Sequence, residues 1–422
     1  MAKPDSPPKL ASPWEAPEES KLAEVGIQAF TSRHLHLFTD LPAEAARTLL
    51  HPADQFWEFL EQTLGTEMPS GLSWTKGPVL AYLMEKESTF SKAGLIPENT
   101  PRHRAGWHLD QGVWVINPST DYFRRHLIFH ELFHAFCNRR RIRLPPPWLD
   151  EGLAEFFATH RLAGNSIQFG VIPRDREELE DWGRIHLIHQ EVKKGKIPTI
   201  EQIRRWTSKD FQELPTYAWS WGMLCFLDQH PRYHSILWGW LKNWTHSPPR
   251  RADFNQLFSP TFEAEWRLFG EELDYGWDGS RAAIDFPENP PPALTDSQQT
   301  KILADRGWQL THWSLSAGKT YHLQATGQAT LASTTRPWTS EPDGISFRYY
   351  RGRPLGRLLG RLLTRTPEGA WRFGPSFSVG STLDFKPPED GVLYLRINDA
   401  WGELQDNQGS YNVTCALEAS AK

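Results

Sequence analysis

The chain has 422 residues, a formal net charge of -5 and a pI near 6.4. This near-neutral balance gives no electrostatic case for binding nucleic acid or an anionic membrane surface. The length is sufficient for about two to three domains with their own cores. No apolar run reaches the roughly 18 residues that a transmembrane helix needs, so no membrane span is predicted.

The cysteines and the first residues bear on the cellular compartment. Cys137, Cys225 and Cys415 are too few, and odd in number, for a disulfide framework, so we expect a fold that does not depend on oxidation. The N-terminus lacks the apolar segment of a signal peptide. We therefore expect a cytoplasmic protein if Met1 is the natural start, and a secreted one if the N-terminus was trimmed.

The N-terminal quarter predicts a small α+β subdomain. Residues 1–25 are rich in Pro, Glu and Lys and are expected to be disordered. Residues 34–38 alternate as a strand does, residues 43–64 follow an amphipathic helical pattern that Pro52 interrupts, and residues 78–83 form a short buried-strand pattern. Together they indicate a small sheet ahead of a helical part.

Residues 126–157 carry the strongest functional signal. His130 and His134 are four residues apart in a run with helical periodicity, which places both imidazoles on one face, one turn apart. Two imidazoles so placed can bind a single zinc ion. Glu131, next to the first histidine, is placed to reach a water on that ion.

A second helical run supplies the remaining groups. It follows a basic turn and three prolines, which cannot continue the first helix. Glu151 and Glu155 lie four residues apart on it, and an antiparallel return would bring Glu151 back to the histidine pair as the third protein ligand. Glu155, one turn further on, would then accept a hydrogen bond from a ligand imidazole and fix its tautomer.

The sequences HELFH and WLDEGLAEFF together resemble the gluzincin metallopeptidases, whose signature is HExxH followed by a glutamate in a W-L-x-E-G-x-A context. The similarity is greatest to a family of uncharacterised bacterial proteins of the peptidase-MA type. The resemblance implies that His130, His134 and Glu151 bind zinc. It also implies that Glu131 is the general base in the hydrolysis of a peptide or protein substrate. The alternative is a helix whose His and Glu are only polar surface residues.

The resemblance implies two further roles. Gluzincins place an edge strand over the metal, and peptide substrates pair with it, so residues 112–117 are assigned that strand and Val113 and Val115 are assigned to substrate binding. The alternative, which the sequence favours equally, is that residues 112–117 form a core strand without contact with substrate. Residues 217–227 predict a buried helix, and Tyr217 at its head matches the gluzincin tyrosine whose hydroxyl stabilises the oxyanion. Its alternative is a tyrosine that only packs.

The C-terminal third has a different composition. A proline-rich run at 287–292 predicts a stiff linker, and the short alternating segments beyond it predict an antiparallel β-sandwich. The predicted fold class is α+β: a gluzincin-like, mainly helical catalytic domain with a small N-terminal β-sheet subdomain, then the sandwich. We predict a disordered N-terminus at 1–25 and a catalytic domain at 26–285. A linker at 286–299 then leads to the sandwich domain at 300–422.

One loop of the predicted sandwich concentrates oxygen side chains suited to a calcium ion: Asp399, Glu403, Asp406 and Asn407. The segment resembles the bacterial calcium-dependent galactose-binding lectin, in which matching loop residues and a main-chain carbonyl near Leu331 hold the ion. Glu403 stands where the lectin has threonine, and its sugar-contacting His and Gln have no clear counterpart in 340–344. The resemblance therefore implies that the loop binds calcium. For carbohydrate binding, the residues that contact the sugar in the lectin have no match here. The alternative is an acidic, solvated turn.

We predict a zinc metallopeptidase whose appended sandwich binds substrate, a glycan or a surface. Two other functions stay open. One is a catalytically inactive calcium- or carbohydrate-binding module, against which the presence of all four catalytic-site residues argues. The other is a zinc hydrolase of non-peptide amides or esters, which shares the same metal chemistry.

Overall fold

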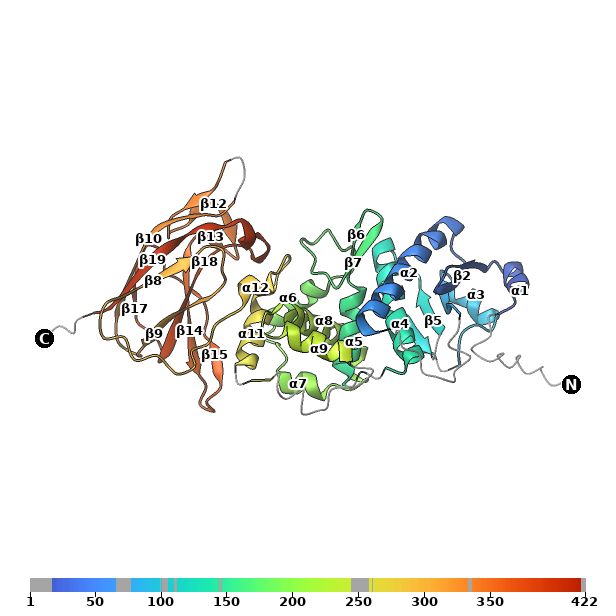
Figure 1. Cartoon of the computed structure of the whole chain (residues 1–422), viewed down its shortest axis with the longest axis horizontal. Coiled ribbons are helices and arrows are strands. Elements are labelled where there is room, and N and C mark those ends of the chain that lie inside the picture. Colours follow the sequence, from blue (N-terminus) through green and yellow to red (C-terminus); the bar gives the residue numbers. More distant parts are fainter. Residues whose placement is uncertain are drawn as a thin grey trace.

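The computed structural model describes residues 17–65, 77–98, 100, 105–109, 112–142, 144, 146–243, 258–259, 261–332 and 336–418. Figure 1 shows three regions along the long axis: a mixed sheet with its helices, a helical middle and a region of antiparallel strands. The chain is therefore a mixed α+β protein, as predicted. Its three cysteines are buried and free, which agrees with a fold that does not depend on disulfides. Within the described ranges, no helix is long and apolar enough to cross a bilayer.

The N-terminal region contains a five-stranded mixed sheet ordered β1-β2-β3-β5-β4. Its strands are β1 (Gln28–Thr31), β2 (Leu35–Thr39), β3 (Val79–Met84), β4 (Gly106–Leu109) and β5 (Gly112–Ile116). Strands β2, β3 and β5 run parallel, whereas β1 and β4 pair antiparallel at the two edges. The sheet matches the small β-subdomain expected from the sequence.

The helices beside this sheet are α1 (Glu19–Glu24), α2 (Ala43–Leu64) and α3 (Glu87–Lys92). Residues 43–64 form the predicted helix, but Pro52 does not interrupt it. Helix α2 buries apolar residues before and after the proline, and this packing outweighs the roughly 3 kcal/mol that a proline costs in a helix interior. Residues 19–24 are helical where we expected disorder, because Leu22 is buried in the same cluster as Phe38.

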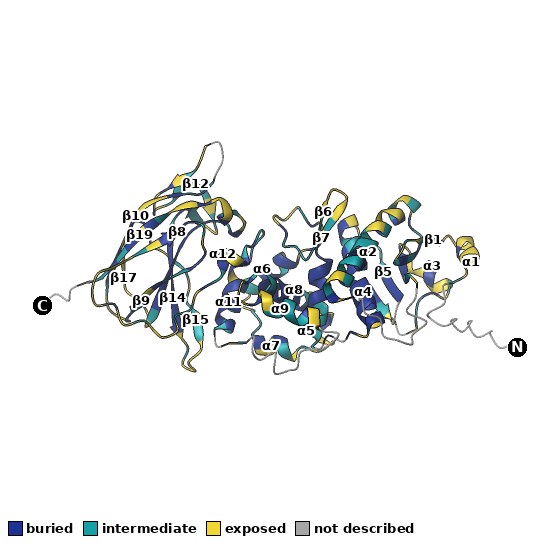
Figure 2. Cartoon of the chain, in the orientation of Figure 1, coloured by how far each residue is buried: buried dark blue, intermediate teal, exposed yellow. Residues whose placement is uncertain are grey.

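The helical middle carries the HExxH motif. Its elements are α4 (Asp121–Arg140), α5 (Pro147–Ala158), β6 (His160–Ala163), β7 (Ser166–Phe169), α6 (Arg184–Lys193), α7 (Ile200–Arg205), η2 (Asp210–Gln212), α8 (Leu214–Gln229), α9 (His234–Asn243), α11 (Phe262–Glu272) and α12 (Gly279–Ala282). Helices α4, α5 and α8 are buried over most of their circumference (Figure 2). Helix α5 packs against both α4 and α8, so the motif lies within the core of this region.

The C-terminal region is an antiparallel β-sandwich, as predicted. One sheet has the order β11-β10-β19-β8 with β17 beside β10, and the other has the order β15-β14-β18-β9 with β16 beside β14. The elements are β8 (Gln298–Leu303), β9 (Gln309–Leu315), β10 (Tyr321–Thr330), β11 (Thr339–Ser340), β12 (Ile345–Tyr350), β13 (Arg353–Leu355), β14 (Leu358–Arg365), β15 (Trp371–Phe373), β16 (Phe377–Ser378), β17 (Thr382–Phe385), β18 (Gly391–Ile397), η3 (Trp401–Asp406) and β19 (Gln408–Leu417). Leu323 and Val413 of one sheet share a buried core with Leu393 and Leu395 of the other.

The sandwich is packed directly on the C-terminal end of helix α11. The Arg351 guanidinium donates to the main-chain carbonyls of residues 271–273 at 2.8, 3.0 and 3.1 Å. Arg396 Nη1 lies 3.1 Å from the Glu272 carboxylate. Cations are favourable at a helix C-terminus, where the last carbonyls have no partner within the helix. The two regions are therefore held by a defined interface as well as by the linker.

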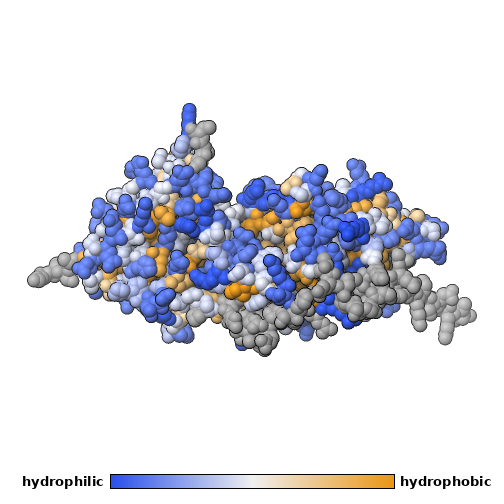
Figure 3. Space-filling model, in the orientation of Figure 1, coloured by the Kyte–Doolittle hydropathy of each residue, from blue (hydrophilic) through white to orange (hydrophobic). Residues whose placement is uncertain are grey.

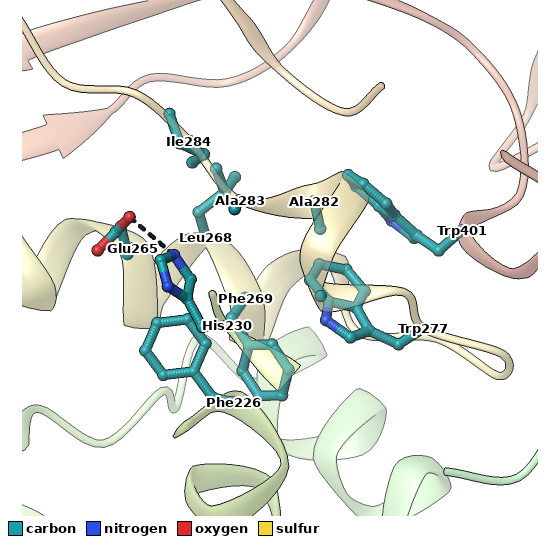
Figure 4. A pocket seen from close by; sticks show the side chains of 11 residues that line it. Phe226, His230, Glu265, Leu268, Phe269, Trp277, Ala282, Ala283, Ile284 and Trp401 are labelled. Atoms are coloured by element: carbon teal, nitrogen blue, oxygen red, sulfur yellow. Dashed lines mark hydrogen bonds and ion pairs between the residues drawn. The ribbon is translucent and has the colours of Figure 1, made fainter. Parts of the chain in front are cut away.

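A small apolar cavity of about 20 Å³ lies at this junction (Figure 4). Trp277 of the helical region and Trp401 of the sandwich line it, with ring centroids 4.5 Å apart. A polar pair also faces it, His230 Nε2 and Glu265 Oε1, separated by 3.2 Å. The volume is room for about one water, so we interpret the cavity as a gap in the packing rather than a ligand site.

Candidate metal centre

Helix α4 positions both histidines of the motif and the glutamate beside them. Thr120 begins the helix, and its side chain accepts a hydrogen bond from the backbone N–H of Phe123. Arg141 ends it with a left-handed backbone, φ 54°. The chain then returns through the prolines, and Pro147 opens helix α5 at a position where a missing N–H is tolerated. This turn brings the glutamates of α5 against the histidines of α4.

The three predicted zinc ligands converge. Nε2 of His130 lies 3.2 Å from Oε2 of Glu151 and 3.3 Å from Nε2 of His134, and the last pair, His134 and Glu151, is 3.5 Å apart. Ligand atoms about 2.0 to 2.1 Å from a tetrahedral zinc are separated by roughly 3.3 to 3.4 Å, because the tetrahedron edge is about 1.63 times the bond length. The observed triangle therefore has the size that zinc requires.

The far sides of both imidazoles are also supported. Nδ1 of His130 lies 3.2 Å from Oε1 of Glu155, and Nδ1 of His134 lies 3.4 Å from Oδ1 of Asp150. A carboxylate at Nδ1 keeps the proton there and leaves Nε2 free to coordinate a metal. The donor set thus fits zinc on two observations, the spacing of the ligand atoms and the carboxylates that lie beside both Nδ1 atoms. Asp150 was not identified from the sequence, although it immediately precedes Glu151.

Arg184 at the start of α6 completes the support beneath the ligands. Its guanidinium binds Glu155 in a bidentate manner, with Nε and Nη2 at 2.8 and 3.0 Å from the two carboxylate oxygens. Burial alone would raise the pKa of Glu155, but Arg184 and His126 hold it well below its usual range. His126, His130 and Glu155 also lie close enough to share an ion. Since Arg184 occupies both oxygens of the carboxylate, we do not interpret that group as a second metal site.

The general base predicted from the sequence is buried beside a residue that was missed. Glu131 Oε2 lies 3.4 Å from Nδ1 of His108 on strand β4, and the His108 ring stacks on His134 at 4.6 Å. A Cβ atom on Gly106 would lie only 2.9 Å from Glu131 Oε1, so a larger residue at this position would displace the Glu131 carboxylate. Burial raises the pKa of Glu131, but neighbouring histidines outweigh burial and lower it, which keeps the carboxylate ionised.

The structure corrects the assignment of the substrate strand. Strand β5, which contains Val113 and Val115, is not at the edge of the sheet: β3 pairs with one side and β4 with the other. Both valines are buried, at 0 and 1 % exposure. Their main-chain groups are already paired in the sheet, so the prediction that residues 112–117 form an edge strand was wrong. In the described part of the sheet, the edge on this side is β4.

Tyr217 lies near the predicted ligands, at the start of α8. Its ring centroid is 6.1 Å from that of His130 and 5.1 Å from that of Phe211, and the side chain is half-buried. The residue is therefore close to the metal centre, and its role there is part of the proposal below.

The C-terminal loop brings together only some of its predicted calcium ligands. Asp399 is fully buried, and its Oδ2 accepts a hydrogen bond of 2.9 Å from Nδ2 of Asn407. Asn407 Oδ1 is buried without a hydrogen-bond partner among the described residues. Burial raises the pKa of Asp399 to about 6. Glu403 instead pairs with Arg348 at 2.7 Å, and Asp406 is exposed. The buried oxygens fit a cation, whereas Glu403 is directed elsewhere.

The electrostatics of the zinc ligands lead to a pH prediction. Burial lowers the pKa of His130, but hydrogen bonds to Glu151 and Glu155 outweigh burial and raise it from 6.5 to about 9. A pKa raised by folding stabilises the fold fully below the unfolded value and loses that contribution as the pH rises through the folded value. Metal-free protein should therefore lose up to about 3 kcal/mol of unfolding free energy between pH 6.5 and pH 9, measured by urea denaturation after chelation.

Zinc-loaded protein serves as the control, because the ion takes the place of the proton between the ligands and should remove most of this dependence. A metal-free His130→Gln variant should lose the part of the dependence that comes from His130 and keep the part from His134, whose pKa is also raised, by Asp150 and Glu151. An unchanged slope in that variant would show that another group is responsible.

Comparison with known proteins finds a family model and solved structures that are similar to parts of the chain. The model of a family described as a protein of unknown function, DUF1570, matches residues 125–249, which contain the histidine and glutamate cluster. No curated protein matches. Among solved structures, the chain is similar to one described as the EclA N-terminal domain, a PllA-like lectin, at 22% sequence identity. That match covers 28% of this chain and 95% of the other, with a TM-score of 0.22.

Proposed function

We propose that the chain is a zinc-dependent peptidase of the gluzincin type. The observation that carries the proposal is the triangle of ligand atoms on the buried His130 and His134 and the half-buried Glu151, with sides of 3.2, 3.3 and 3.5 Å. A carboxylate next to this triangle, Glu131, is buried and ionised. A polar surface helix would leave these groups in water, and their burial argues against that alternative.

The catalytic steps follow from the protein's own groups. A zinc ion bound at the site would lower the pKa of a water to about 7 and polarise a carbonyl. Glu131 accepts the proton of the attacking water and returns it to the leaving amine nitrogen. His108 keeps the Glu131 carboxylate in place from the side of β4. The hydroxyl of Tyr217 stabilises the developing oxyanion, a contribution on the order of 3 kcal/mol for a well-placed donor.

Strand β4 is the element that we propose for substrate binding. It forms the sheet edge beside helix α4, and it carries Gly106 and His108 against Glu131. An extended peptide that adds to this edge is held by its main chain, so many sequences can be accepted. We therefore propose β4, the neighbour of β5 in the sheet, for the role that was expected of residues 112–117.

The test combines metal analysis with an unbiased digest. Purified full-length protein should contain about one zinc per chain, and it should cleave a peptide library at defined bonds. Zinc without cleavage of any peptide, but with turnover of small amides or esters, would favour a hydrolase of another substrate class. Absence of stoichiometric zinc would overturn the proposal.

Calcium binding by the sandwich is a separate part of the proposal. Asp399 supplies a buried carboxylate and Asn407 a buried oxygen without a hydrogen-bond partner among the residues described. A cation that binds only the folded state at a hundredfold excess over its Kd stabilises it by about 2.7 kcal/mol. We expect calcium to raise the Tm of chelator-treated protein, and Asp399→Asn to remove the shift. Magnesium is the control ion, because it demands shorter bonds and a stricter octahedral geometry.

A further inference from the structure

A polar cleft of about 710 Å³ lies between the helical region and the sandwich. Loop 170–176 forms one wall, Tyr350 and residues 400–403 form the other, and residues 274–277 close it. Figure 3 shows the surface hollowed between the two regions. Within the described part of the chain, none of the zinc ligands lines this cleft, so it is a separate feature of the molecule.

The floor of the cleft is a close contact between two backbones. A Cβ atom on Gly276 would lie 2.9 Å from the Cα of Gly402, and one on Gly402 would lie 3.0 Å from the Cα of Gly276. Beneath them, Trp277 packs against Trp401 at 4.5 Å. Only glycines allow the two regions to approach this closely, and the packed indoles keep them there. The cleft therefore has a fixed shape and a volume in the range of small-molecule sites.

Loop 170–176 brings three charged side chains to the cleft, two arginines and one carboxylate, Asp175, which accepts hydrogen bonds from the backbone N–H groups of Glu177 and Glu178 at 3.0 and 2.9 Å. Arg174 and Arg176 are exposed on loop 170–176, and neither has an ion-pair partner among the described residues. The carboxylates of the facing wall are already engaged: Asp274 accepts a hydrogen bond of 2.8 Å from the Tyr350 hydroxyl, and Glu403 pairs with Arg348. The two arginines, two residues apart on one loop, favour a carboxylate or another small oxyanion.

The rest of the cleft favours a ligand with hydroxyl groups over a dense polyanion. The carboxylates of Asp274 and Glu403 would repel nucleic acid or a run of acidic residues, but their oxygens can each accept further hydrogen bonds. The half-buried ring of Tyr275 offers an apolar face between these groups. A sugar that carries a carboxylate presents an anion, several hydroxyl donors and an apolar ring face within one ligand of this size.

We propose that this cleft between the two regions binds an acidic saccharide. Arg174 and Arg176 bind its carboxylate, Asp274 accepts from its hydroxyl groups, and Tyr275 packs on its ring. The site goes beyond the peptidase proposal and does not depend on it, because no zinc ligand contributes to it. The cleft shares Glu403 with the loop predicted to bind calcium, but the two buried residues of that loop, Asp399 and Asn407, do not line it.

The test is a calorimetric titration of the full-length, chelator-treated protein with two acidic oligosaccharides, trigalacturonate and sialyllactose. At least one should bind saturably, and neutral lactose should bind at least tenfold more weakly. The double variant R174A/R176A should weaken binding at least tenfold. A charge-matched double variant on distant exposed arginines, R33A/R205A, should bind as the wild type does. Because zinc is absent, the result is independent of catalysis.

Three outcomes would overturn the saccharide site. The first is no saturable binding of either oligosaccharide. The second is an equal loss of affinity in R174A/R176A and R33A/R205A, which would indicate only a general effect of net charge. The third is binding of a hexaglutamate peptide at least as tightly as the sugars, which would assign the cleft to acidic peptides instead. Each variant's Tm is measured, and the double variants are expected to fold because all four arginines are on the surface.

Discussion

The Glu131→Gln variant is expected to lose hydrolysis almost completely while it keeps its zinc. The amide is nearly isosteric with the carboxylate, but it cannot accept the proton of the attacking water. General bases contribute about 10²- to 10⁴-fold, so kcat/KM on a peptide found in the library digest should fall by at least about 10²-fold. Zinc content, measured by elemental analysis, should stay near one per chain, because Glu131 is not among the three converging ligands.

The shape of the site makes this substitution informative. Glu131 fills the space above Gly106, and a side chain of equal size keeps that contact and the neighbouring His108 in place. A matched control is Glu58→Gln on helix α2, where an exposed glutamate pairs with Arg33 and activity should not change. Full activity of Glu131→Gln would reject the assigned base. Loss of zinc from that variant would instead make Glu131 a ligand.

The parts of the site that the sequence predicts are those fixed by local geometry. His130 and His134 share a helix face whatever surrounds the helix, because their spacing is one turn. The segment between His134 and Glu151 is long enough for a turn and an antiparallel return, so the approach of Glu151 to the histidines could be predicted. Glu155 lies one helical turn after Glu151, so its position follows from that of Glu151.

The residues that were missed or misplaced depend on contacts between distant segments. His108 reaches Glu131 only because β4 pairs antiparallel with the outer side of β5, and strand order cannot be read from strand patterns. Because the strand order was not known from the sequence, Val115 was assigned to an edge strand of the sheet. Arg184 is the first residue of α6, and nothing in the neighbouring sequence marks it as the partner of Glu155 on α5, which two strands separate from α6 along the chain.

The sandwich shows the same limit. The oxygen-rich loop at 399–407 is visible in the sequence, and its position after a strand was expected. What could not be foreseen is that Arg348, on a distant strand, would pair with Glu403, or that Trp401 of the same loop would pack against Trp277 of the helical region. The role of a side chain in this loop therefore depends on which distant residue packs against it, and the sequence of the loop does not contain that information.

The Arg184→Met variant is expected to weaken both the fold and the metal site. Methionine keeps the apolar volume but leaves the Glu155 carboxylate, only 3 % exposed, without its bidentate partner. Removing one partner of a buried ion pair typically destabilises a protein by about 3–5 kcal/mol. Disturbing a carboxylate that orients a ligand histidine lowers metal affinity about 10- to 100-fold. Urea denaturation and zinc competition with a chelator measure the two effects separately.

The double variant Glu155→Gln/Arg184→Met distinguishes the two roles of the pair. It removes both charges at once, so no unpaired charge stays buried, and much of the lost unfolding free energy should return. Zinc affinity should stay low, because a neutral amide orients His130 less strongly than a carboxylate does. Arg161→Met is the matched control: Arg161 pairs with Glu178 outside the metal centre, so its loss should lower the Tm without changing zinc affinity. Wild-type zinc affinity in Arg184→Met would mean that Glu155 holds the ligand histidine without help from the guanidinium beneath it.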